Sequence, residues 1–187
     1  MERRQVLKTA GILATGGVTG LAGCSSSGNG DGGDEPTTTA TQETAGGSGD
    51  SNTVMMVTEG SEYYFDPIGL FVESGETVTF EIQSGSHSAT AYKEGTSSAS
   101  VTRIPEEAEA FNSETLSEQG ATYEHTFETT GTYDYFCIPH KSLGMVGRIV
   151  VGEPGGPAEG SMPPDGDVPE SQTIVDQGSV SYSSFSG

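Results

Sequence analysis

The chain has 187 residues, and its 28 Gly and 9 Pro leave room for one small domain with flexible ends. Its formal net charge of −20 would repel nucleic acid and anionic lipid headgroups, which argues against both as direct ligands. So many acidic residues with so little Lys are typical of proteins from salt-loving organisms. In 1 M salt the repulsion between these charges is screened to a range of about 3 Å. We therefore expect folding to depend on salt.

Residues 1–23 form an export signal. Arg3 and Arg4 make a twin arginine, and a short apolar run of small residues follows them, which is the pattern of the twin-arginine route. The run is too short and too rich in Gly for a membrane-spanning helix, which needs about 20 predominantly apolar residues. Removing this segment leaves 4 basic and 26 acidic residues, a net charge of −22.

Cys24 directly follows the signal in the stretch LAGC. This stretch resembles the lipobox of bacterial and archaeal lipoproteins, whose cysteine carries the lipid. The resemblance implies that Cys24 is lipidated and holds the mature chain at the outer face of the cytoplasmic membrane; the alternative is a plain signal with an incidental cysteine. Because the chain has only 2 cysteines, lipidation leaves Cys137 without a disulfide partner.

Residues 24–52 are expected to form a flexible, lipid-anchored acidic linker. The 28 residues of 25–52 include no aromatic and no basic residue and are rich in Gly, Ser and Thr. Such a composition cannot bury enough apolar surface to order itself. As a flexible coil, the linker would reach roughly 30 Å, which lets a domain swing above a membrane.

Residues 53–152 alternate apolar and polar side chains in short runs bounded by Gly and Ser, which predicts strands. The runs are 54–58, 70–73, 77–82, 88–92, 123–127, 132–137 and 146–151. Within the third run, Val78, Phe80 and Ile82 share one face. This density of short strands predicts an all-β fold, a two-sheet antiparallel β-sandwich.

Residues 93–122 interrupt the strands with a longer polar excursion. The stretch 104–111 contains Pro105 and predicts a helical turn or two, but no long amphipathic helix. Beyond a cap over one side of the sandwich, the sequence assigns no role to this excursion.

The strand 132–137 sorts its side chains by parity. Tyr133 and Tyr135 share a face with Cys137, and we expect all three to point inward. Phe136 then lies on the outside, where an exposed aromatic ring is either a docking contact or an ordinary surface residue.

The stretch FCIPHKSLGMV at 136–146 crowds three metal-binding side chains into one loop. Cys137 offers a thiolate, His140 an imidazole and Met145 a thioether. Thiolate and thioether suit copper(I), imidazole suits copper(II), and a site that holds both states uses two His, one Cys and a weak axial Met. Pro139 stiffens the turn between Cys137 and His140.

The missing second histidine is either His87 or His125. His87 follows the apolar strand 77–82 in a loop, where a side chain can project from the end of a sandwich. His125 lies in mid-strand between Tyr123 and Phe127, and we interpret it as a structural side chain satisfied by a local hydrogen bond. We therefore favour His87 as the ligand.

The segment GTYDYFCIPHKSLGMVGRIVV at 131–151 resembles the copper loop of the plastocyanin-like cupredoxins. The setting resembles the halocyanins, lipid-anchored blue copper proteins of halophilic archaea. The resemblance implies a Greek-key β-sandwich over 53–152 and one type 1 copper ion bound by His87, Cys137, His140 and Met145. It also implies that His140 lies near the surface and exchanges electrons with redox protein partners of a membrane electron-transport chain.

The surroundings of this predicted site depart from the plastocyanin pattern in two places. Ser88 stands where plastocyanins usually carry Asn, and it offers a smaller hydrogen-bonding clamp. Phe136 replaces the Tyr that commonly precedes the cysteine in plants. An apolar shell is expected to limit water entry and tune the potential; its members are Phe136, Ile138, Pro139 and Leu143.

Competing interpretations remain for the loop. A cysteine hydrolase is disfavoured, since Cys137 and His140 are too close in sequence and no oxyanion-hole signature accompanies them. Zinc accepts Cys and His, but the thioether of Met145 is a poor zinc ligand. We expect a monomeric one-electron carrier rather than an enzyme; the alternatives are a copper-delivery module and a metal-free adhesion domain.

Residues 153–187 begin rich in Pro and Gly and end with some strand character at 173–185. Partial docking of this tail on the sandwich is our expectation. The sequence assigns it no role.

Overall fold

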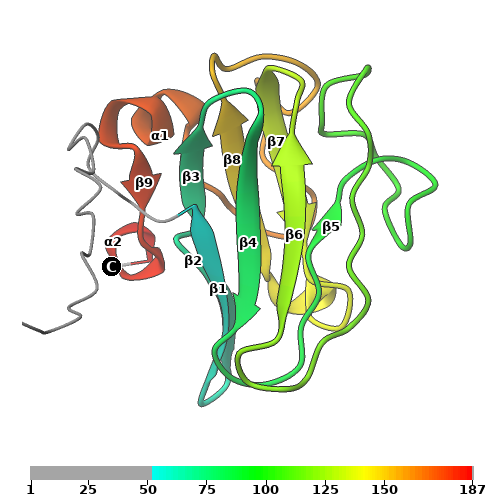
Figure 1. Cartoon of the computed structure of the whole chain (residues 1–187), viewed down its shortest axis with the longest axis vertical. Coiled ribbons are helices and arrows are strands. Elements are labelled where there is room, and N and C mark those ends of the chain that lie inside the picture. Colours follow the sequence, from blue (N-terminus) through cyan, green and yellow to red (C-terminus); the bar gives the residue numbers. More distant parts are fainter. Residues whose placement is uncertain (1–51, 187) are drawn as a thin grey trace, which may run out of the picture. The chain divides into compact units, whose positions relative to one another are not determined.

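The computed structural model describes residues 52–186, which form two β-sheets facing each other (Figure 1). The first sheet has the strand order β2-β1-β4-β6 and the second β5-β7-β8-β3-β9. Their strands are β1 (Thr53–Glu59), β2 (Glu62–Asp66), β3 (Gly69–Val72), β4 (Glu76–Ile82), β5 (Thr90–Ala91), β6 (Thr122–Phe127), β7 (Gly131–Phe136), β8 (Val146–Val151) and β9 (Ser179–Val180). Three short helices accompany them: η1 (Lys141–Leu143), α1 (Ser171–Gln177) and α2 (Tyr182–Phe185).

The predicted β-sandwich is confirmed, and both of its sheets are mixed. β1 runs parallel to β4, and β3 runs parallel to β8, while the other pairs are antiparallel. The two strands of a parallel pair must be joined by a crossover connection. In this fold the chain makes each crossover by passing from one sheet to the other and back. The chain thus alternates between the two sheets, which enclose the main core between them.

The seven expected strands are all present, but the run 88–92 is reduced to Thr90–Ala91. The preceding residues bond to the excursion instead: the N–H of Ala89 donates to Ser113 Oγ at 2.8 Å, and His87 forms a bridge with Leu116. Strand β2 was not expected, whereas β9 lies within residues 173–185, where some strand character was expected. In β2 only Phe65 is fully buried, so the segment lacks the alternation that would have revealed it.

The core lies between the sheets and is largely aliphatic and aromatic. Val78, Phe80 and Ile82 are buried there as the alternation predicts. Tyr133, Tyr135 and Cys137 join the same cluster, which confirms the predicted inward face of β7. The end of β7 thus places a thiol inside the sandwich.

The outer face of the second sheet is also covered, because every residue of β7 and β8 is buried. The expectation of an exposed Phe136 is wrong. Its ring is fully buried against Tyr92, Ala99 and Val168, and the ammonium of Lys141 lies 4.8 Å from its centroid. The excursion and the C-terminal segment supply this cover, so Phe136 cannot be a docking contact.

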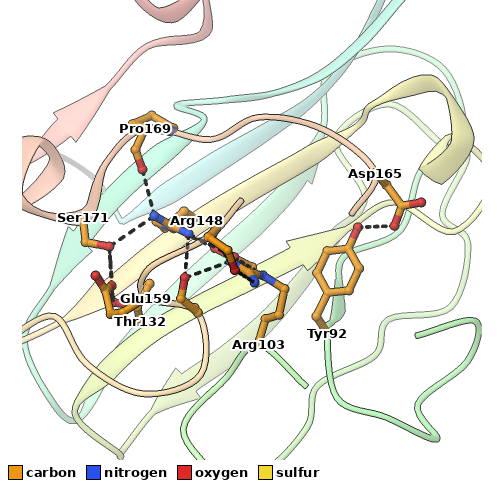
Figure 2. Close-up of polar contacts among 11 residues, drawn as sticks. Tyr92, Arg103, Thr132, Arg148, Glu159, Asp165, Pro169 and Ser171 are labelled. Atoms are coloured by element: carbon orange, nitrogen blue, oxygen red, sulfur yellow. Dashed lines mark hydrogen bonds and ion pairs between the residues drawn. The ribbon is translucent and has the colours of Figure 1, made fainter. Parts of the chain in front are cut away.

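A buried charge network holds the cover to the sheet (Figure 2). Asp134 on β7 receives a 2.7 Å hydrogen bond from the Nε of each of Arg103, in the excursion, and Arg148, on β8. Both guanidiniums also donate to the carbonyl of Ala158, in the C-terminal segment. The two cations share the Asp134 carboxylate and the Ala158 carbonyl, and each donates to one further carbonyl, Ser161 for Arg103 and Pro169 for Arg148, so both buried charges are hydrogen-bonded.

Residues 153–186 pack on the sandwich, in agreement with the expected docking. Of the strand character expected at 173–185, only β9 is a strand, and the residues on either side of it form α1 and α2. Ile174 of α1 and Val180 of β9 are buried together with Ile68 and Val150. β9 pairs with β3, and the ring of Tyr182 in α2 stacks on Tyr64 at 4.1 Å.

The excursion, residues 93–122, is irregular up to Thr122, where β6 begins. After Pro105 it makes a single turn, closed by a 3.0 Å bond from Ala108 N–H to the Pro105 carbonyl, which is the short end of the helical turn or two expected there. Ile104 and Phe111 still reach the main core. The excursion is therefore part of the packed domain and covers its edge and outer face.

Three predicted features lie outside the described residues: the twin arginine Arg3–Arg4, the lipidation site Cys24 and the flexible linker. Within residues 52–186, no helix is long and apolar enough to cross a membrane.

Candidate metal centre

Three of the predicted ligands converge at one end of the sandwich. Cys137 follows β7, His140 lies three residues later before η1, and His87 follows β4. The Sγ of Cys137 lies 3.4 Å from Nδ1 of His140 and 3.7 Å from Nδ1 of His87, and the two Nδ1 atoms are 3.2 Å apart. Two imidazole nitrogens and one thiol sulfur therefore face a common point.

Backbone hydrogen bonds close the loop that carries His140 and Met145. The N–H of Cys137 donates to the carbonyl of Met145 at 3.1 Å, and the N–H groups of His140 and Met145 donate to Cys137 and His140 at 3.2 and 3.3 Å. Met145 is fully buried in the cluster that contains Cys137. The loop spacing thus brings Met145 back beside the cysteine, and its role as an axial ligand stays a prediction.

His87 is held by its other ring nitrogen. Nε2 lies 2.9 Å from the carbonyl oxygen of Ser84 and 3.0 Å from Oγ1 of Thr58. A carbonyl only accepts, so Nε2 carries the proton and Nδ1 keeps its lone pair for a metal. Gly85 permits this approach: its φ is +84°, and a Cβ there would collide with Thr58 Oγ1 and come within 3.0 Å of His87 Nε2.

Ser88 clamps the cysteine loop as the sequence indicated. Its backbone N–H points at Cys137 Sγ at 3.4 Å, and its Oγ accepts a 2.8 Å bond from the N–H of Ile138. Ser88 is fully buried, so these bonds are shielded from water. They tie the segment after β4 to the loop after β7.

The expected apolar shell is wrong in part. Phe136 is buried and Ile138 is half-buried, but Pro139 is exposed and Leu143 is 61% exposed. These two side chains therefore flank the partly exposed His140 at the surface and do not exclude water from the site. The loop turns outward after Ile138, which the spacing of ligands does not reveal.

Burial sets the protonation states of the three donors. It raises the pKa of the Cys137 thiol, although hydrogen bonds from Ser88 and His140 act in the other direction. It lowers the pKa of His87, against the bond to the Ser84 carbonyl, and it lowers the pKa of His140. Near neutral pH the imidazoles are neutral and ready to bind a metal, whereas the thiol must lose a proton.

His125 lies elsewhere, as expected. It sits on β6 with its ring 4.8 Å from the rings of both Phe111 and Phe127. Among the described residues, its side chain has no hydrogen-bond partner, so aromatic packing takes the place of the expected hydrogen bond.

Sequence reasoning missed Ser84, three residues before His87, and two residues from distant segments, Thr58 on β1 and Tyr63 on β2. Tyr63 stacks on His140 with 3.9 Å between ring centroids and 15° between planes. No motif includes Thr58 or Tyr63, because the contacts join segments far apart in the chain. The only available signal was the aromatic pair at 63–64, in a segment that the periodicity did not mark as a strand.

The donor set suits copper. A buried thiol and two imidazoles lie within 4.8 Å of one another, and a buried thioether stands in the same loop. Soft sulfur with imidazole nitrogen serves both copper oxidation states, whereas hard cations prefer oxygen ligands.

Comparison with known families decides the affiliation. Residues 33–152 match the model of the copper-binding proteins of the plastocyanin/azurin family. The chain belongs to this family. One copper ion is accordingly its cofactor, which confirms the prediction made from the loop.

Individual relatives agree with this assignment. The chain is 32% identical over 108 residues to the chloroplastic plastocyanin of Hordeum vulgare, a match that covers 57% of this chain and 66% of that protein. It is 32% identical over 107 residues to the halocyanin of Natronomonas pharaonis, covering 56% and 58%. The chain thus spans less than two thirds of the length of these relatives.

Among solved structures, a pseudoazurin from Sinorhizobium is similar, with 26% identity and a TM-score of 0.47 over 67% of this copper-binding chain and 91% of that chain. A purple cupredoxin from Nitrosopumilus maritimus is 24% identical with a TM-score of 0.40, covering 53% and 97%.

Proposed function

We propose that this chain is a blue copper protein that carries single electrons between redox partners. His87, Cys137, His140 and Met145 hold the copper in this proposal. One observation carries it: a buried thiol and the Nδ1 atoms of two histidines meet within 4.8 Å. Copper, when bound, supplies the redox chemistry by alternating between its +1 and +2 states.

The way the donors are held favours electron transfer over bond chemistry. Ser84 and Thr58 fix the ring of His87, and Ser88 fixes the loop at Cys137. A site whose ligands are already oriented needs little rearrangement between oxidation states. His87 and Cys137 are fully buried, so they would be shielded from a substrate, and the proposed task of the chain is to keep the metal and not to transform a ligand.

Exposure indicates where electrons would pass. His87, Cys137 and Met145 are buried, and His140 alone of the four is partly exposed. Pro139 and Leu143 offer apolar surface beside it. A redox protein would dock over His140, because this residue offers an electron the shortest route from the metal to the surface.

Charge narrows the class of partner. All four basic side chains of the described part already have protein partners: Lys93, Arg103, Lys141 and Arg148. The remaining exposed charges are carboxylates, so a partner with a basic rim around an apolar centre fits this surface best.

Attachment to a membrane is part of the proposal and rests on the sequence. Export by the twin-arginine route and lipidation of Cys24 would place the chain, as a monomer, at the outer face of the cytoplasmic membrane. The chain enters the sandwich at Thr53, and Thr58, which touches His87, follows five residues later, about 16 Å along β1. The linker would therefore join the domain away from the copper end and leave His140 free for partners.

The first test is the visible absorption spectrum of the exported chain loaded with copper(II), compared with Cys137→Ser and with His125→Gln as a matched control. We expect an intense blue thiolate-to-copper band that Cys137→Ser abolishes and His125→Gln retains. A colourless protein that prefers zinc would refute the copper centre.

A second measurement separates an electron carrier from a copper-delivery module. The loaded protein is cycled with a chemical reductant and oxidant in the presence of a copper(I) chelator. A carrier cycles reversibly and keeps its metal. Loss of copper to the chelator upon reduction would instead establish delivery.

A further inference from the structure

One cross-strand pair touches both histidines of the copper site. Thr58 of β1 and Tyr63 of β2 are directly opposite each other in the antiparallel hairpin. Thr58 contacts His87, and Tyr63 contacts His140. Neither residue belongs to the cysteine loop or to the segment after β4, so the hairpin is a third, independent support for the site.

Tyr63 fixes the plane of His140. The two rings lie nearly parallel, at 15° with centroids 3.9 Å apart, and Tyr63 also meets His87 edge-on at 6.5 Å and 63°. No hydrogen bond to the His140 side chain comes from outside the ligand set in the described residues. The stacked tyrosine is therefore the contact that restrains the rotation of this partly exposed ring.

Thr58 contributes to the orientation of His87. Its Oγ1 lies 3.0 Å from Nε2, beside the Ser84 carbonyl at 2.9 Å. With the proton on Nε2, both oxygens accept, and together they aim Nδ1 at Cys137.

The hairpin is itself tied to the segment that carries His87. The N–H of Thr58 donates to Ser84 Oγ at 2.9 Å, and Ser84 Oγ donates to the Thr58 carbonyl at 2.8 Å. The N–H of Gln83 adds a 3.0 Å bond to the Met56 carbonyl. Thr58 and Tyr63 are therefore held at a fixed place relative to both imidazoles.

We infer that the Thr58–Tyr63 pair is a positioning device that orients both imidazoles for copper before the metal arrives. This inference rests on copper binding by His87 and His140 and is independent of any electron partner. Outer residues that orient metal ligands typically contribute 10- to 100-fold to metal affinity. The stack on the partly exposed His140 is the larger contribution, because Ser84 still holds His87 when Thr58 is lost.

The test compares Tyr63→Ala, Tyr63→Phe and the control Tyr64→Ala in the exported chain. Tyr64 is the next residue on the same strand and stacks on Tyr182 rather than on a histidine. Copper(I) affinity is measured by competition with a chelator. We expect Tyr63→Ala to weaken binding about 10-fold, while Tyr63→Phe, which keeps the ring, and Tyr64→Ala stay within about twofold of the parent.

A readout without metal shows whether orientation is the cause. In the copper-free protein, NMR relaxation of the imidazole groups should show greater motion of His140 in Tyr63→Ala alone, with His125 unchanged as an internal reference. Equal affinity and equal ring motion in Tyr63→Ala and the parent would overturn the inference. A parent that binds no copper would instead refute the proposed copper centre.

Thr58 is tested by Thr58→Val and Thr58→Ser, with Thr77→Val as the control. Thr77 bonds to Thr126 across an exposed strand pair, away from the site. Thr58→Val should weaken copper(I) binding about threefold, and Thr58→Ser should restore it. If Thr58→Val and Thr77→Val behave alike, Thr58 has no positioning role.

Discussion

At the scale of single residues, copper binding depends on which donor atoms of the histidines and of Cys137 carry a proton. Ser84 holds the proton of His87 on Nε2, which leaves Nδ1 for the metal. Burial keeps the Cys137 thiol protonated and both imidazoles neutral, because it disfavours every charged form. The metal-free site is thus uncharged, and a cation must displace one proton to enter.

Copper binding should therefore release one proton near neutral pH. The pKa of the Cys137 thiol is raised above its ordinary value, so below that pKa the apparent affinity rises about tenfold per pH unit. Since the pKa values of His87 and His140 are lowered, the imidazoles add protons to this release only in more acidic solution. Calorimetry in two buffers of different ionisation enthalpy counts the protons.

The control for proton release is Cys137→Ser, which has no thiol to ionise. It should bind copper(II) weakly and release no proton at neutral pH. Release of two or more protons from the parent at pH 7 would contradict the assigned protonation states.

At the scale of elements, β7 serves the copper site with its inner face and, together with β8, a buried charge network with its outer face. The inner face of β7 leads to Cys137, and its outer face carries Asp134, which binds the guanidiniums of Arg103 and Arg148. Glu159 joins this cluster: burial raises its pKa, but hydrogen bonds from Ser171 and Thr132 and the nearby arginines lower it overall. The excursion and the C-terminal segment are thereby fastened to the strand that ends at the metal.

Asp134→Asn should destabilise the domain strongly. The substitution leaves two buried guanidiniums without their shared carboxylate, and breaking a buried ion pair in this way typically costs about 3–5 kcal/mol. Urea unfolding at fixed salt measures the loss. Glu114→Gln, at an exposed position, is the control and should change stability by less than about 0.5 kcal/mol. Equal stability of the two variants would show that the network contributes little.

At the scale of the whole molecule, charge is distributed unevenly. All four basic side chains of residues 52–186 are engaged with protein partners, two of them in the buried network, so the surface of this described part carries carboxylates without free cations between them. Mutual repulsion of these carboxylates opposes the compact state until salt screens it.

The thermal midpoint of unfolding should therefore rise between low and molar potassium chloride. Screening shortens to about 3 Å at 1 M salt, which removes most of the repulsion between surface carboxylates. Differential scanning calorimetry measures the midpoint, with sucrose at equal osmolality as a control for general exclusion effects. A midpoint that stays constant across this range would contradict the role of surface charge.

Several properties of this protein could be read from the sequence alone because their causes are local. Strand alternation placed Val78, Phe80 and Ile82 in the core. The spacing of Cys137, His140 and Met145 within one hydrogen-bonded loop indicated copper. Donor chemistry and loop length do not depend on distant segments, so the sequence sufficed for the family and the cofactor.

Only the tertiary structure decided what touches the site and what covers the sheet. Parity put Phe136 on the outer face of β7, but the excursion and the C-terminal segment bury it. Thr58 and Tyr63 reach the histidines through contacts that join residues 29 and 77 positions apart. Such contacts follow from how sheets stack and strands pair across the chain, and no local pattern of side chains encodes them.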